Sequence, residues 1–247
     1  MTDEAFETTF TLDYVKRSLP ARCRRVLEVG AGTGELAARL LRDGLAVVAL
    51  DSDPDAVATA RTLGVDARLA RWPQPLDEPF DAVLFTRSLH HIHRLEESVN
   101  AAAAGLAPHG RVVVEDVAIE AADERTLAWF TEALRLLRDS GRLPGHSALL
   151  EDLLATGGSP AVWQEHHDHD LHGAAAMEAA LGAALTEVEV EAAPYLFRYL
   201  GAALAKAPAR DTLVRALAEQ ERTLIADGAI AALGWRLRGT VASVIPG

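Results

Sequence analysis

The chain has 247 residues, of which 49% are hydrophobic and 24% are charged, and its formal net charge is −12. This composition can build a sizeable core, and the length suits one domain with an elaboration. The acidic balance disfavours a DNA or RNA partner, and a single cysteine, Cys23, excludes an internal disulfide or a cysteine-rich zinc site. The sequence shows no signal-peptide pattern and no uncharged run of the ~18 residues that span a bilayer, so we expect a cytoplasmic protein with no membrane partner.

The first twenty residues carry an irregular apolar pattern that predicts a short helix ending near Pro20. A short apolar run, Val26–Val29, then breaks into Gly30-Ala31-Gly32-Thr33-Gly34, and a helical pattern follows from Glu35. Glycines at a strand-to-helix turn allow positive φ and close approach of a ligand, while the helix start leaves N–H groups unpaired. The stretch therefore indicates a site for a nucleotide-like ligand.

The second predicted strand, Ala46–Leu50, ends in Asp51, 21 residues after the first glycine of the loop. A carboxylate at that place can accept hydrogen bonds from both hydroxyls of a ribose. The glycine spacing departs from the dinucleotide fingerprint G-x-G-x-x-G, and Glu28 beside the loop suits a ligand with an ammonium and a sulfonium better than a pyrophosphate. An NAD-dependent oxidoreductase is therefore the less favoured alternative.

Strand and helix patterns alternate from Arg24 onward, which predicts an α/β fold with a parallel sheet and right-handed crossovers. Arg71 and Trp72 follow the third strand at its carboxyl end, where open α/β sheets bind ligands. Pro108–Gly110 is expected to turn the chain into a fifth strand. That strand ends in two acids that either orient a substrate or simply begin the next loop, namely Glu115 and Asp116.

Taken in order, these motifs resemble those of the class I S-adenosylmethionine (SAM)-dependent methyltransferases, in particular their small-molecule branch. The resemblance runs from about Arg24 to Asp116, and the segments that carry it are Glu28–Gly34, Asp51, Arg71–Pro73, Phe80–Phe85, Ser88–Ile92 and Leu106–Val114. It implies a Rossmann-like, doubly wound, seven-stranded and mostly parallel sheet with helices on both faces and an inserted helical cap.

The resemblance also implies an activity: transfer of a methyl group from SAM to an O, N, C or S nucleophile of a small-molecule acceptor, such as a specialised metabolite, by in-line displacement. A protein that binds SAM without catalysis, or serves as a scaffold, stays open as an alternative because the reaction needs little catalytic machinery. The acceptor and the oligomeric state are not encoded in any motif of the sequence.

The resemblance assigns cofactor contacts to residues of the loop and of the strand ends. Similar enzymes have an acid where this chain has Arg71, so the adenine contact is expected from backbone groups and from stacking on Trp72, unless Trp72 is only an exposed loop residue. The predicted cofactor-binding residues are Glu28, Gly30, Ala31, Gly32, Gly34, Asp51, Ser52, Arg71, Trp72, Thr86 and Ser88.

Two histidines are candidates for a general base, which is needed only if the acceptor must lose a proton. His91 follows the fourth strand at the ligand rim, and the imidazole pKa near neutrality suits proton transfer. The alternative for His91 is a packing or capping role at the start of a helix. His167, from the predicted cap, is the second candidate.

The resemblance divides the chain into residues 1–23 as a cover of the cofactor cleft, 24–120 as the SAM-binding core, 121–172 as the helical cap of the substrate pocket, and 173–247 as the rest of the core sheet. A helix that only fills one edge is an equal alternative for the first segment. Within the last, Thr186–Glu191 alternates strictly and predicts an antiparallel strand, and further elements are a helix over Arg210–Ala226 and a strand near Trp235–Val244.

The segment Glu165–His172 holds four histidines and three acids, a composition that could bind zinc, manganese or iron. Its ligand types are consecutive, however, and not spaced at the i, i+4 interval that places two side chains on one helix face. We therefore expect a polar pocket wall or a solvated strand, and no metal site.

Overall fold

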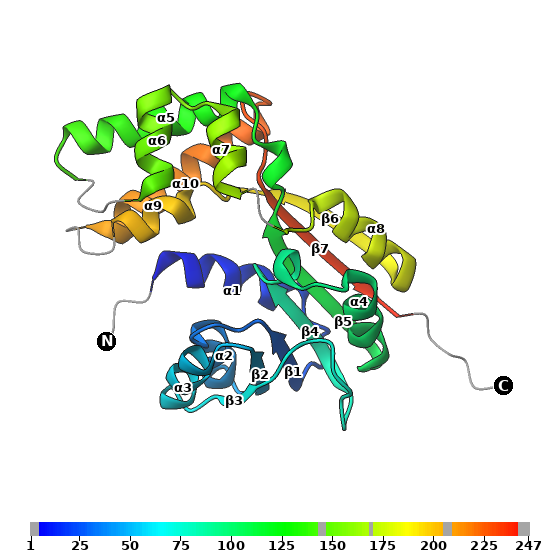
Figure 1. Ribbon diagram of the computed structural model, residues 1–247. Coiled ribbons are helices and arrows are strands. Elements are labelled where there is room, and N and C mark those ends of the chain that lie inside the picture. Colours follow the sequence, from blue (N-terminus) through cyan, green and yellow to red (C-terminus); the bar gives the residue numbers. More distant parts are fainter. Residues whose placement is uncertain (1–4, 143–146, 168–169, 205–208, 242–247) are drawn as a thin grey trace. The chain divides into compact units, whose positions relative to one another are not determined.

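The computed structural model describes residues 5–142, 147–167, 170–204 and 209–241 (Figure 1). Contacts divide the chain into two compact units, each assembled from segments that are distant in the sequence. Unit 1 contains Met1–Glu7, Val117–Leu171 and Ala192–Trp235, and unit 2 contains Thr8–Asp116, His172–Glu191 and Arg236–Gly247. Unit 2 carries the loop and the strand ends that the sequence marks as a ligand site.

Seven strands form one sheet in the order β3-β2-β1-β4-β5-β7-β6. Strand β1 pairs in parallel with β2 and β4, β2 pairs in parallel with β3, and β4 with β5. The strands are β1 (Arg25–Val29), β2 (Ala46–Asp51), β3 (Asp66–Leu69), β4 (Phe80–Thr86), β5 (Leu106–Val117), β6 (Thr186–Ala193) and β7 (Gly234–Thr240).

The last two strands run antiparallel to each other. The hydroxyls of Thr186 and Thr240 lie 3.3 Å apart, at the start of β6 and the end of β7. At their other ends, a Cβ on Gly234 would meet the Ala193 carbonyl. The antiparallel strand that the alternation predicts is therefore confirmed, together with the mostly parallel seven-stranded fold.

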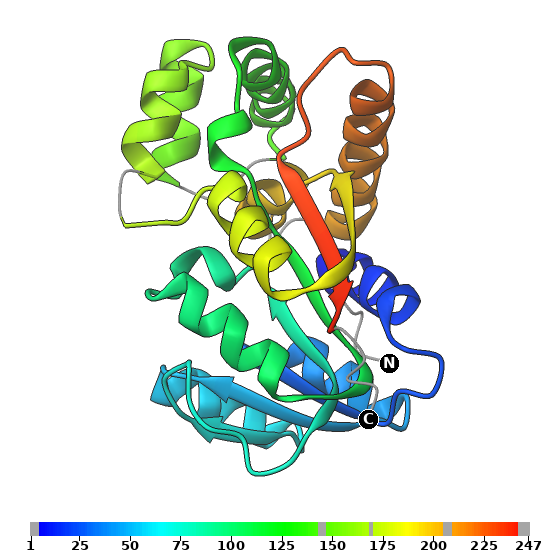
Figure 2. The same ribbon diagram turned by 90° about the vertical axis from the view of Figure 1, so that its right-hand side faces the viewer.

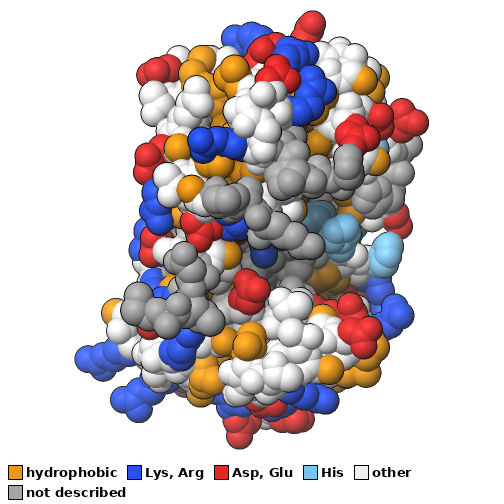
Figure 3. Space-filling model, turned by 90° about the vertical axis from the view of Figure 1, so that its left-hand side faces the viewer, with side chains coloured by type: hydrophobic (Ala, Val, Ile, Leu, Met, Phe, Trp, Pro, Cys, Tyr) orange, Lys and Arg blue, Asp and Glu red, His pale blue; other side chains and the backbone are white. Residues whose placement is uncertain are grey.

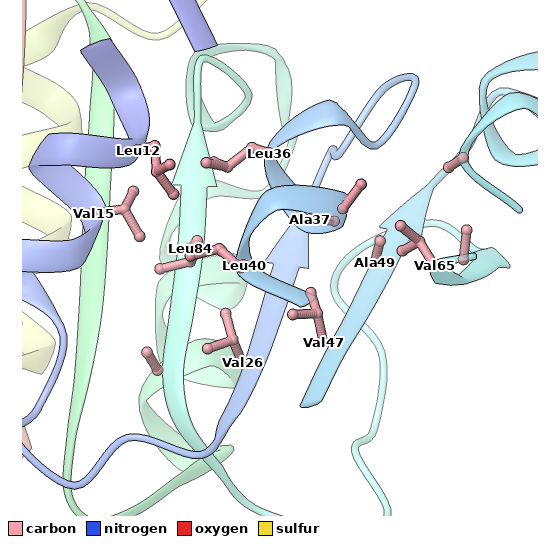
Figure 4. Packing of buried hydrophobic residues seen from close by; sticks show 14 of the residues in the cluster. Leu12, Val15, Val26, Leu36, Ala37, Leu40, Val47, Ala49, Val65 and Leu84 are labelled. Carbon is pink, nitrogen blue, oxygen red and sulfur yellow. The ribbon is translucent and has the colours of Figure 1, made fainter. Parts of the chain in front are cut away.

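Helices of unit 2 cover both faces of the sheet (Figure 2). On one face, helix α1 (Phe6–Ser18), α2 (Glu35–Arg42) and α3 (Pro54–Thr62) pack on alternate strand residues. On the other, α4 (Leu95–Ala104) and α8 (Ala174–Ala184) contact each other. Figure 4 shows the first of these layers, in which buried apolar side chains from the helices and strands interlock; the labelled ones include Leu12, Val15, Val26, Leu36, Leu40, Val47 and Leu84.

Local signals in the sequence account for the helix boundaries next to the site. Gly34 (φ +75°) stands at the start of α2 in the left-handed conformation that glycine tolerates. The carboxylate of Asp53 accepts the Asp55 N–H at 2.9 Å, and Pro54 takes the first helical position of α3, where a missing N–H costs nothing. These caps fix where the loops after β1 and β2 end.

Unit 1 is helical and has its own core. Its helices are α5 (Glu124–Asp139), α6 (Ala148–Thr156), α7 (Pro160–His167), α9 (Phe197–Ala203) and α10 (Arg210–Ala226). Phe130, Trp163 and Phe197 are fully buried. Unit 1 thus joins the predicted cap segment to residues 192–235, and Tyr199 of α9 meets the rings of Phe130 in α5 and Trp163 in α7. The functional division of the chain into cover, core and cap stays a prediction.

Two local predictions were wrong, and a third was only partly testable. Pro108–Gly110 does not precede the fifth strand as a turn but lies inside β5, opposite a register shift between Phe80 and Ala82, since a bulge accommodates a proline without a ladder N–H. Glu165–His167 end a helix and form no strand. The last strand ends at Thr240, and the rest of its predicted length, 242–244, lies outside the described residues.

The described residues include no helix with the length and apolar character of a membrane span. Acidic and basic side chains are interspersed over the face of the molecule that Figure 3 presents, in keeping with the balance of 36 acidic and 24 basic residues.

Candidate functional site

Two cavities lie at the carboxyl ends of the parallel strands in unit 2. The larger, about 540 Å³, is lined by residues that follow β1, β2, β3 and β4, and we call it the aspartate cavity after Asp51. The smaller, about 360 Å³, is lined by Glu28, by the glycine loop and by α1, and we call it the glutamate cavity. Gly30 and Arg87 line both. Strand ends at a switch in strand order are where open α/β sheets bind ligands.

The three glycines of the loop all have the left-handed backbone conformation, but a side chain would meet different surroundings at each position. A Cβ on Gly30 (φ +69°) would come within 2.5 Å of the Ser88 Cβ, and a Cβ on Gly34 would come equally close to that of Ala60. A Cβ on Gly32 (φ +54°) would meet no atom within 4 Å. Ser88 of the post-β4 segment therefore occupies the space beside Gly30, and the predicted contact of Gly30 with the cofactor stays a prediction. Only Gly32 faces open space in the glutamate cavity.

The carboxylate of Asp51 connects the glycine loop to the loop after β2. One oxygen accepts the Gly32 N–H at 2.7 Å and the other accepts the Asp53 N–H at 2.9 Å. Each carboxylate oxygen has a further lone pair, so Asp51 retains capacity to accept from a ligand in the aspartate cavity. Its protein contacts hold the carboxylate in place before any ligand arrives.

Glu28 is a buried acid at the floor of the glutamate cavity and is 1% exposed. One carboxylate oxygen accepts the Thr86 hydroxyl at 2.9 Å, and the other has no hydrogen-bond partner among the described residues. Burial raises the pKa of Glu28 to about 7, against the lowering effects of the Thr86 hydrogen bond and the Arg87 charge. An unsatisfied buried acceptor of this kind suits a ligand that donates N–H bonds.

The raised pKa makes a prediction for stability. Because the folded-state pKa lies above the ordinary 4.5, the stabilising contribution of Glu28 is complete below pH 4.5 and is lost as the pH rises toward 7. Glutamine does not titrate, so only the unchanged chain loses this contribution. The free energy of unfolding of Glu28→Gln minus that of the unchanged chain should therefore rise by about 3 kcal/mol in total between pH 4.5 and 7. Urea unfolding of both proteins between pH 4.5 and 8 measures this difference, and parallel curves would contradict it.

The third strand brings Arg71 and Trp72 to the wall of the aspartate cavity. The Trp72 indole N–H donates to the Ser98 carbonyl at 3.2 Å, and its ring meets Phe85 edge to face with centroids 6.3 Å apart. Trp72 is therefore held in a fixed orientation, and it is not an exposed loop residue. The arginine at position 71 is exposed, and no acid replaces it among the cavity-lining residues that follow β3.

The turn after β4 places His91 at the wall of the aspartate cavity, whereas the preceding residue, His90, is buried. Residues Leu89–His91 form one turn of 3₁₀ helix. The His90 ring lies 2.5 Å from the Asp116 carboxylate through Nδ1 and 4.0 Å from the His91 ring, centroid to centroid. Of the two histidines, His91 alone lines the cavity.

The two acids at the end of β5 are both committed to protein partners. Glu115 accepts the Thr11 hydroxyl at 2.6 Å and the Arg236 Nε–H at 2.8 Å, while Asp116 is paired with His90. Both acids are at most 2% exposed. They therefore brace the sheet and the post-β4 turn and do not line either cavity.

The histidine-rich segment is divided between the two units. In unit 1, the His167 ring bonds the Trp163 carbonyl at 2.6 Å and the Tyr199 hydroxyl at 2.9 Å, and stacks on Trp163. His172 belongs to unit 2, and 168–169 lie outside the described residues. Among the described residues no three metal-ligating side chains converge. Both His167 nitrogens have protein partners, so its assignment as a second base stays a prediction with little support.

Ten of the eleven predicted cofactor residues line one cavity or the other, and Gly34, which packs against α3, lines neither. Cavity-lining residues that were not predicted include Thr8 and Thr11 of α1 and three basic residues of the post-β4 segment, Arg87, His93 and Arg94. Arg87 lies between two predicted residues, Thr86 and Ser88, so its lining position could have been predicted from the sequence. The lining positions of Thr8 and Thr11 could not be predicted from the sequence, because they depend on how α1 packs on the sheet.

Comparison with known proteins identifies the family. Residues 5–167 match the model of a family described as a methyltransferase domain. A ubiquinone biosynthesis O-methyltransferase of Xylella fastidiosa is 36% identical over 132 residues, which cover 50% of this chain and 51% of the relative. The chain thus spans about half the length of the curated relatives it matches.

Solved structures share the fold over nearly the whole chain. A SAM-dependent methyltransferase of Thermotoga maritima, a possible histamine N-methyltransferase, has 17% identity and a TM-score of 0.52, and the match covers 95% of this chain and 89% of the other. A putative sarcosine dimethylglycine methyltransferase of Galdieria sulphuraria has 14% identity, a TM-score of 0.57 and coverage of 95% and 85%. At these identities the likeness concerns the fold.

Proposed function

Because the chain belongs to the methyltransferase domain family, we propose that it transfers a methyl group from SAM to a nucleophile of a small-molecule acceptor. The family and fold predicted from the sequence motifs are confirmed. The observation that carries the proposal is the Asp51 carboxylate, which is bonded to the Gly32 N–H at the rim of the aspartate cavity. This carboxylate would accept the ribose hydroxyls beside Gly32, the glycine of the loop that faces open space.

The chemistry of the residues that line both cavities supports SAM as the ligand. In the aspartate cavity, Asp51 would accept from the ribose and Trp72 would offer a ring face or edge to the adenine. In the glutamate cavity, the unsatisfied oxygen of Glu28 would accept from an ammonium group, and Gly32 leaves the space that a side chain would fill. Gly30, which lines both cavities, would lie beneath the junction of the two halves of the cofactor.

When bound, SAM supplies a methyl group that its sulfonium already activates. The protein must then hold the acceptor in line with that group and exclude water. The small-molecule class of the acceptor is supported by the formal net charge of −12, which disfavours nucleic acid, and by the 36% identical relative named a ubiquinone biosynthesis O-methyltransferase. The methylated atom is not specified by any described residue.

His91 is one of two histidines, with His93, that line the aspartate cavity after β4, and we expect it to accept a proton from the acceptor where transfer requires that proton to be lost. In His91→Ala and His91→Gln, the single-turnover rate of methyl transfer should fall at least ~10²-fold, while the SAM dissociation constant stays nearly unchanged. Equal losses of rate and affinity would make His91 a support of the cofactor site. No loss of either would leave the transfer to positioning of the acceptor alone.

Transfer of a labelled methyl group from SAM to a panel of phenols, amines, thiols and carbon acids tests the proposed function. Incorporation into one class, lost in Asp51→Ala, is the expected result. SAM binding without transfer to any acceptor would favour a non-catalytic binding protein. Reduction of NAD by a hydroxy-compound panel would favour the oxidoreductase alternative.

A further inference from the structure

His172, the last residue of the histidine-rich segment, is bonded to the turn after β4. Its backbone N–H donates to the His90 carbonyl at 2.9 Å, and its ring Nε2 lies 3.0 Å from the Ile92 carbonyl oxygen. A carbonyl can only accept, so Nε2 carries a proton and donates it. The two carbonyls flank His91, and His172 therefore holds the backbone on both sides of that residue.

A second contact fixes the same turn from the sheet. Asp116, which is fully buried at the end of β5, has one oxygen 2.5 Å from the His90 Nδ1 and accepts the His90 N–H through the other at 3.2 Å. The His90 ring in turn lies 4.0 Å from the His91 ring. Segments that are far apart in the chain thus contact the same turn, and this turn brings His91 to the cavity wall.

These contacts exceed what the turn itself requires. The His91 and Ile92 N–H groups already close it through the Ser88 and Leu89 carbonyls, both at 3.1 Å. The turn therefore forms without His172, and the contacts with His172 fix how the turn is oriented. Catalytic groups are effective only when neighbouring contacts hold them in the productive geometry.

We propose that His172 is a positioning residue for His91, and that it holds the turn from which the His91 imidazole reaches the wall of the aspartate cavity. This inference rests on the proposed function. The role that it gives to His172 requires no metal. It depends on a hydrogen bond from Nε2 to the Ile92 carbonyl, which both the neutral and the charged forms of the ring can donate.

Two substitutions at one position separate positioning from simple packing. His172→Ala removes the ring donor and keeps the backbone N–H, whereas the amide nitrogen of His172→Gln can replace Nε2 as the donor to the Ile92 carbonyl. We expect His172→Ala to lower the single-turnover transfer rate on the order of tenfold with SAM affinity unchanged, and His172→Gln to restore most of it. The matched control is His109→Ala, an exposed histidine near the start of β5 that lines neither cavity, and its rate should equal that of the unchanged chain.

A double-substitution cycle then tests whether His172 acts through His91. In a His91→Ala background, His172→Ala should cause no further loss of rate. Additive losses, or a lower melting temperature without rescue of the rate by His172→Gln, would overturn the inference. Hydrogen exchange of residues 88–94, which needs no activity, should accelerate in His172→Ala but not in His172→Gln, and unchanged exchange would also overturn it. Absence of SAM binding by the unchanged chain would instead contradict the proposed function.

Discussion

Replacement of Asp51 by alanine is expected to weaken SAM binding by roughly 2 to 4 kcal/mol, which is about thirty-fold or more. The substitution removes the carboxylate that would accept from the ribose. It also releases the Gly32 and Asp53 N–H groups, which the two oxygens accept at 2.7 and 2.9 Å. Titration calorimetry with SAM measures the change in the dissociation constant.

Two further variants show which part of the Asp51 carboxylate matters. Asp51→Asn keeps the shape but turns an NH₂ group toward one of the two N–H donors, so an intermediate loss of affinity is expected. Asp53→Ala removes a neighbouring acid that caps α3 and does not line the aspartate cavity. It should reduce stability by about 1 kcal/mol and leave SAM affinity unchanged. Unaltered affinity in Asp51→Ala would show that the ribose lies elsewhere.

Replacement of Arg236 by methionine is expected to lower the free energy of unfolding by about 3 to 5 kcal/mol. The Arg236 guanidinium is buried, donates to Glu115 through Nε at 2.8 Å, and lies over the rings of Phe10 and Tyr14 at 4.5 and 4.6 Å. The substitution leaves the Glu115 carboxylate, 2% exposed, without its cation. Urea unfolding monitored by circular dichroism measures the loss.

The double variant Arg236→Met with Glu115→Leu is the control for this loss. It replaces both charges by apolar groups of similar length, and buried pairs exchanged in this way often lose little stability. We expect it to recover most of the free energy lost in Arg236→Met. If the single variant is as stable as the unchanged chain, the pair does not brace β5 and β7, and the arrangement of α1 over these strands needs another explanation.

Sequence alone was sufficient where structure depends on neighbours in the chain. The β1 strand, the left-handed glycines and the start of α2 follow from one run of ten residues, and the α3 cap follows from Asp53 and Pro54. The parallel pairing of β1 to β5 was predicted from the alternation of apolar runs and helices, because parallel strands need crossovers. The family resemblance supplied the eleven cofactor residues, of which ten line one of the two cavities at the strand ends.

Contacts between distant residues could not be predicted in this way. Ser88 fills the space beside Gly30, 58 positions earlier in the sequence, and Arg236 pairs with Glu115 across a separation of 121. Both contacts depend on which strands become neighbours and on side-chain geometry. The partition of residues 166–172 between the two units likewise reflects packing, which composition does not encode.

Titration calorimetry with SAM, S-adenosylhomocysteine and NAD, performed on the same preparation, tests most directly whether the two cavities form a SAM site. The expected result is saturable binding of SAM and S-adenosylhomocysteine at one site per chain, weakened about thirty-fold or more in Asp51→Ala, with no binding of NAD. Saturable binding of NAD with none of SAM would contradict the account.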